Sequence, residues 1–238
     1  MDNKTTSSSD LSLNGLVTRS NMEPTLHAIE SGAFWSLLQT TGISRRRALL
    51  DWGAFVVRCR RALTEQSGPT QRIVKGQTYS RDIKLLGGGS YPVTWVIEDL
   101  LRLITRWNLG PVTIPARSLL PGVVVQDLDL HRLGGVNLEA PQKHPVIVVQ
   151  YPLLAERWAV VDGNHRVFRA AEVNQTISMV WLNEQQMLEG LAFDAHRTYY
   201  AVHWNLSAWL NAEIDEQARI PGWMPLGMHD GTKPPRVQ

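Results

Sequence analysis

The stretch Val160-Val161-Asp162-Gly163-Asn164-His165-Arg166 decides the fold of the chain. Two runs rich in β-branched residues, 144–151 and 157–161, come just before its turn and are typical of strands. Gly163 permits a sharp turn, and Asn164 is a favourable N-cap for residues 165–173, which have helical composition and no helix breaker. The stretch therefore predicts a strand, a tight turn and a helix.

The predicted turn is chemically suited to an anion such as phosphate, because the first N–H groups of a helix lack intrahelical partners and lie at its positive end. Arg166 can clamp phosphate oxygens in a bidentate manner. Asp162 can hold Mg²⁺ or orient a water, and His165 can transfer a proton. These three residues form the predicted catalytic set. The predicted nucleotide- or phosphate-binding residues are Gly163, Asn164, His165, Arg166 and Arg169.

The same residues also fit a turn that has no function. Asp-Gly-Asn is common turn chemistry, and His165 can simply cap or pack. Arg166 and Arg169 can pair with acids such as Glu172. The sequence leaves this structural interpretation open beside the functional one.

Residues 111–189, with the strand at 144–150, the turn Asp162-Gly163-Asn164-His165-Arg166 and an alanine-rich helix after it, resemble the ParB/sulfiredoxin superfamily. The resemblance implies an α+β (α/β-like) fold with a small mixed sheet and helices. In that family the N-terminus of the corresponding helix binds the phosphates of ATP or CTP, or meets a nucleic-acid backbone.

Differences from the family favour one of its branches. Sulfiredoxin-like members have a catalytic cysteine where this chain has Asn164, and the single cysteine here is Cys59, so sulfinic-acid reduction is not expected. Chromosome-partition members begin this helix with Gly-Glu-Arg-Arg and continue into a helix-turn-helix domain, for which too little chain follows. The remaining resemblance is to the Osa-type plasmid fertility-inhibition proteins.

This last resemblance implies hydrolysis of ATP or another nucleoside triphosphate with Mg²⁺, and metal-dependent DNA cleavage as a further activity. It also implies interference with the conjugative transfer of another plasmid, with DNA and a conjugation or type IV secretion component as partners. The alternative is a non-catalytic module that binds nucleotide or DNA, as a partition or transcription regulator or as a secretion-machinery inhibitor.

Composition sets only broad limits on function. The chain has 238 residues, 43% of them hydrophobic, which suits a globular core. A net charge of +2 is too small to indicate nucleic-acid binding without a local cluster. One cysteine excludes an internal disulfide, and no uncharged apolar run approaches the roughly 18 residues of a membrane span. We expect a cytoplasmic protein without membrane insertion.

The pattern along the chain predicts six regions. They are a disordered lead (1–22), a helical hairpin (23–66), a connector and helix (67–110), the ParB/sulfiredoxin-like domain (111–192), a C-terminal helix (193–214) and an extended or disordered tail (215–238).

The predicted N-terminal hairpin consists of helices at 24–40 and 44–64, joined at Thr41-Gly42-Ile43-Ser44. Six arginines fall between positions 45 and 61, and they can hold DNA phosphates without reading sequence. Packing of the hairpin on the domain with a solvated arginine rim is the favoured alternative. The candidate contacts to DNA phosphate are Arg45, Arg46, Arg47, Arg58 and Arg61.

Three weaker patterns are present in the sequence. Gly87-Gly88-Gly89-Ser90, before a helix expected at 94–108, is interpreted as a turn rather than a phosphate cradle, because it lacks a Gly-Lys-Ser/Thr ending. A strand expected at 123–130 would align Asp127, Asp129 and His131 on one face, either near Asp162 or facing solvent. His196 and His203 are interpreted as structural.

Overall fold

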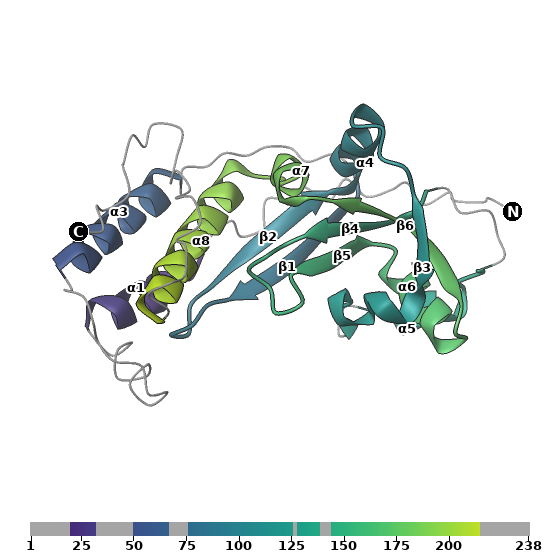
Figure 1. Ribbon diagram of the computed structural model, residues 1–238, viewed down its shortest axis with the longest axis horizontal. Helices are drawn as coiled ribbons and strands as arrows, with labels where there is room; N and C mark the ends of the chain where they lie inside the picture. The colour runs from purple at the N-terminus through teal and green to yellow at the C-terminus, as the bar shows by residue number, and fades with distance from the viewer. Residues whose placement is uncertain (1–19, 32–49, 67–75, 126–127, 139–143, 215–238) are drawn as a thin grey trace, which may run out of the picture.

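The computed structural model describes residues 20–31, 50–66, 76–125, 128–138 and 144–214, which form an α+β fold with two small sheets (Figure 1). The strands are β1 (Thr78–Lys84), β2 (Ser90–Val96), β3 (Val112–Pro115), β4 (Val146–Gln150), β5 (Trp158–Asp162) and β6 (Thr176–Leu182). The helices are α1 (Glu23–Glu30), α3 (Leu50–Gln66), α4 (Ile97–Arg106), the 3₁₀ helix η1 (Ala116–Gly122), α5 (Leu130–Gly134), α6 (Asn164–Glu172), α7 (Glu184–Glu189) and α8 (Asp194–Ile214).

The larger sheet has the order β3-β6-β4-β5 and is mixed. Its central strands β4 and β6 are parallel, and each outer pair is antiparallel. Residues alternate across this sheet, as the pleat requires. Ile147 and Val149 face a large core shared with α8, whereas Val146 and Val148 face a smaller core closed by α6 and η1. All four are fully buried, so the sheet separates two hydrophobic layers.

The N-terminal helices belong to the large core. Figure 1 shows α1, α3 and α8 gathered at one end of the molecule, with α5 and α6 near the other. Leu26 and Val56 are completely buried there, and Arg60 Nη2 lies 2.9 Å from Glu30 Oε2, which ties α3 to α1. The predicted link between the two helices lies within 32–49, outside the described residues.

Within the region predicted as a connector and helix (67–110), the connector is wrong over its second half, because residues 78–96 form the β1–β2 hairpin. The alternation of Tyr91, Val93 and Trp95, all buried, stabilises β2 despite Pro92. The glycines at 87–89 form the hairpin turn as expected, with φ of +85° at Gly87. Strand β2 pairs with β1 as far as Val96, so α4 begins at Ile97, three residues after the start predicted at 94.

The strand predicted at 123–130 is also wrong. Residues 116–122 form η1, and α5 begins at Leu130. The apolar side chains Leu119, Val123 and Leu128 all enter the smaller core, at a spacing that no strand provides. Asp129 and His131 therefore share no strand face, and Asp127 lies outside the described residues.

In the C-terminal half, the strands predicted at 144–151 and 157–161 and the helices predicted at 165–173 and 193–214 are confirmed as β4, β5, α6 and α8, with small shifts at their ends. Asn183 caps α7 through a capping box with Gln186, and α8 covers β2 and α3. Among the helices that the structure describes, none has both the length and the apolar character needed to cross a bilayer.

Candidate functional site

The turn between β5 and α6 is the centre of the candidate site. β5 ends at Asp162, Gly163 adopts φ +87° and ψ 18°, and α6 begins at Asn164. The predicted order of strand, turn and helix is confirmed, but the N-cap is Gly163 and not Asn164. A Cβ on Gly163 would lie 2.8 Å from Val146 Cγ2, so both the left-handed backbone and the close packing require glycine.

A glycine cap leaves the first turn of α6 without a side-chain acceptor. No side chain caps this helix. The backbone N–H groups of its first turn therefore lie at the positive end of the helix without a side-chain acceptor. Beside them, Asn164 Oδ1 is buried and has no hydrogen-bond partner. A half-turn of this amide would present its NH₂ group instead, so a ligand with acceptor oxygens can satisfy the side chain.

Asp162 is the hub of the site and its side chain is only 11% exposed. Its Oδ2 lies 3.2 Å from Arg166 Nη2 and 3.2 Å from His144 Nδ1. Its Oδ1 accepts a 3.4 Å hydrogen bond from Gln77 Nε2. The carboxylate therefore contacts side chains from the segment before β4, from α6 and from the segment before β1.

Arg166 lies against the end of the sheet. Nη1 donates to the His144 carbonyl at 2.7 Å, while Nη2 donates to Asp162. The side chain is 16% exposed. The guanidinium thus holds the segment before β4 against the end of β5. A direct phosphate clamp by Arg166 requires it to exchange one of these partners.

The two histidines of the site both carry a proton on Nδ1, but they differ in what Nε2 contacts. His144 Nδ1 lies 3.2 Å from Asp162 Oδ2 and 3.3 Å from the Pro145 carbonyl oxygen. Both are acceptors, so Nδ1 carries a proton, and in the neutral ring Nε2 has the lone pair. His165 Nε2 instead accepts the backbone N–H of Asp129 at 2.9 Å, so its proton is on Nδ1. His165 ties the segment before α5 to the turn.

Sequence reasoning missed His144 and Gln77. His144 stands at the start of the β4 run, and only the pairing of β4 with β5 brings it beside Asp162. Gln77 carries no sequence signal, yet its backbone is anchored twice. Its N–H donates to Glu98 Oε1 at 3.0 Å, and its carbonyl accepts from the Ile97 N–H at 2.9 Å.

The arrangement does not suit a Mg²⁺ ion bound directly by Asp162. Both carboxylate oxygens already accept from cationic or N–H donors. Within the part of the chain that the structure describes, no group of three or more His, Cys, Asp and Glu side chains is placed to hold a metal. Mg²⁺ usually retains several waters and binds through substrate phosphates, so it would enter with the nucleotide.

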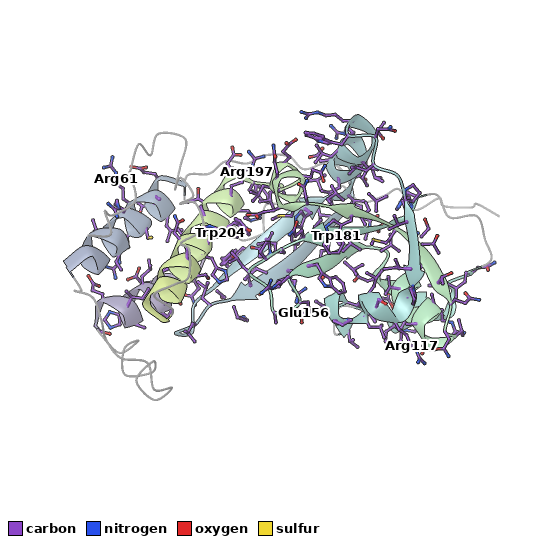
Figure 2. All side chains as sticks on the ribbon, in the orientation of Figure 1. Arg61, Arg117, Glu156, Trp181, Arg197 and Trp204 are labelled. Carbon is purple, nitrogen blue, oxygen red and sulfur yellow. The ribbon has the colours of Figure 1, made fainter. Side chains whose placement is uncertain are left out.

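The remaining candidate residues lie away from this cluster. Arg169 pairs with Glu172 at 2.8 Å on the exposed side of α6, as the structural alternative predicts. Arg61 pairs with Glu65 and projects from α3 (Figure 2), whereas Arg58 has a buried Nε without a partner. Arg45, Arg46 and Arg47 lie outside the described residues.

His196 and His203 are buried parts of the large core. The Thr94 N–H donates to His196 Nδ1 at 3.1 Å, and Tyr91 Oη lies 2.9 Å from His203 Nδ1. Burial lowers the pKa of each imidazole to about 4. Both are neutral at pH 7 and serve packing.

Comparison with known proteins identifies no relative of the chain. No protein-family model matches the chain, and no curated protein or solved structure matches it either. The assignment of function therefore depends on the residues of the site.

Proposed function

We propose that the chain binds a nucleoside triphosphate, ATP or CTP, at the N-terminus of α6 and hydrolyses it. The observation that carries the proposal is the left-handed Gly163 cap. It leaves the first-turn N–H groups of α6 without a capping side chain, next to the buried Asn164 Oδ1, which has no hydrogen-bond partner. Backbone donors at a helix N-terminus are a general means of phosphate binding.

The charged residues support this role by shaping the turn. Asp162 and Arg166 form an ion pair across the first turn, so the end of β5 and the start of α6 are held together. Fixed N–H dipoles stabilise the charge that develops during phosphoryl transfer without reorganising. Mg²⁺ accompanies the nucleotide in this proposal and neutralises its phosphates.

The biological setting in the proposal comes from the resemblance to Osa-type proteins alone. It comprises plasmid fertility inhibition, contact with a conjugation or type IV secretion component, and DNA cleavage as a further activity. The compartment is the cytoplasm, where ATP and CTP are supplied. The sequence feature behind it is the short motif from Gly163 to Arg166.

A second candidate is a module that binds nucleotide without hydrolysis. The engagement of both Asp162 oxygens favours it, because that carboxylate then has no free position for a metal or a water. The two candidates share the binding site and differ only in turnover.

Phosphate release from ATP and CTP with Mg²⁺, measured beside binding by calorimetry, tests the proposal. We expect turnover in the wild type and its loss in Asp162→Ala and Arg166→Ala, because both variants release the turn. Arg197 is a half-exposed arginine on α8 (Figure 2), and Arg197→Ala is the matched control that should behave as wild type. Binding without release would support the second candidate, and neither binding nor release would reject both.

A further inference from the structure

We infer that His144, and not His165, is the general base that activates the attacking water, with Asp162 as its positioning carboxylate. This inference rests on the proposed hydrolysis of a nucleoside triphosphate. It assigns a catalytic residue that the sequence pattern did not indicate, and it gives Asp162 a role that needs no metal.

The first support is the availability of a lone pair. A general base must accept a proton on an unprotonated nitrogen. His144 Nδ1 is directed at two acceptors, Asp162 Oδ2 and the Pro145 carbonyl, so Nε2 is the basic nitrogen. The contacts of the described residues leave this nitrogen without a partner, and the His144 side chain is 25% exposed.

His165 lacks this availability. Its Nε2 lone pair accepts the Asp129 N–H at 2.9 Å, and its other nitrogen must then carry the proton. Using His165 as a base would require breaking that hydrogen bond and releasing the segment before α5. The geometry thus separates the two imidazoles into a base and a tether.

The second support is the placement of Asp162. A carboxylate that accepts from Nδ1 fixes the tautomer of the ring and stabilises the imidazolium that forms when Nε2 takes a proton. Arg166 and Gln77 hold the same carboxylate from two other directions. Arg166 also donates to the His144 carbonyl, so one guanidinium holds both the carboxylate and the backbone of the histidine.

The proposed step balances without any further reactant. Nε2 of His144 takes a proton from water while the water oxygen forms a bond to the γ-phosphorus. The bond from that phosphorus to the bridging oxygen breaks, and the nucleoside diphosphate leaves with the electron pair. The imidazolium beside Asp162 then returns its proton to solvent, which regenerates the base.

The test compares His144→Ala, His144→Gln, His165→Ala and His27→Ala in the intact chain, with ATP as substrate. We expect His144→Ala to lower kcat by about 10²–10⁴-fold, with KM changed only a few-fold, and imidazole in the buffer to restore part of the rate. His144→Gln keeps an N–H donor for Asp162 but no base, so it should fold as wild type and remain inactive. His27 is exposed on α1 and its variant serves as the control.

The tautomers provide a readout that does not depend on turnover. Long-range ¹H–¹⁵N spectra should show the proton of His144 on Nδ1, with His165 protonated on Nδ1 and its Nε2 accepting from Asp129. Wild-type turnover that persists in His144→Ala, or a loss rescued by imidazole only in His165→Ala, would overturn the inference and leave the proposed function standing. A wild type that hydrolyses neither ATP nor CTP would reject both.

Discussion

Replacing Gly163 by alanine should destabilise the fold and distort the candidate site together. The residue has φ +87°, a conformation that costs a residue with a Cβ about 1–2 kcal/mol. The new Cβ would lie 2.8 Å from Val146 Cγ2 and 2.9 Å from Arg166 Nη2. Overpacking of a filled core adds about 1–3 kcal/mol. We expect a loss of about 2–5 kcal/mol in the free energy of unfolding.

Urea unfolding followed by tryptophan fluorescence measures this loss. Gly110→Ala is the matched control, because no neighbouring atom lies within 4 Å of the position of its Cβ. Gly163→Asn separates the two causes, since asparagine tolerates the left-handed region but still brings a Cβ against Val146. If Gly163→Ala unfolds at the same urea concentration as Gly110→Ala, the turn is not built as described.

Three further predictions concern stability. A double-mutant cycle on Asp162 and Arg166 should give a coupling free energy of about 1–2 kcal/mol, because both side chains are mostly buried. The half-exposed Arg169–Glu172 pair should give less than about 0.5 kcal/mol. Equal coupling energies for the two pairs would contradict the central role of Asp162. Burial lowers the pKa of His196 and His203 to about 4, so the unfolded chain binds these protons more readily. Urea titrations should therefore show full stability above about pH 6.5 and a loss as the pH falls toward 4, with His196→Asn flattening the slope and a flat wild-type profile counting against it. Thr25→Val should lower the free energy of unfolding by about 1–3 kcal/mol, because the buried Thr25 hydroxyl donates to the Leu86 carbonyl at 2.8 Å and accepts from the Gly89 N–H at 3.1 Å. Thr105 is exposed, so the Thr105→Val variant should unfold almost as wild type. Similar losses of stability in the two variants would refute this reasoning.

Local patterns predicted the elements around the candidate site well. Strand β5, the glycine turn and helix α6 follow from β-branched residues, one glycine and a run of helix formers, all of which act over a few residues. The N-cap assignment failed because Asn164 and Gly163 are both compatible with a cap, and only the backbone of the turn decides between them.

Long-range pairing was beyond the sequence pattern. The β1–β2 hairpin contains Pro92 and a glycine-rich turn, and burial of its aromatic residues against α8 overrides these signals. In the segments 116–125 and 128–130, the buried side chains Leu119, Val123 and Leu128 follow the shape of the core beside α6, not an alternating period. The same limit hid His144 and Gln77, which are 18 and 85 positions from Asp162 but contact it in space.

The most direct test of the central claim is to record the backbone amide signals of the intact protein by NMR while ATP and Mg²⁺ are added. We expect the amides of Asn164, His165 and Arg166 to shift with a saturable dependence on ATP, because they begin α6 and would receive the phosphates. Amides in the middle of α8, such as that of Val202, should remain unchanged. Shifts confined to other parts of the chain, or the absence of any shift, would contradict phosphate binding at the turn.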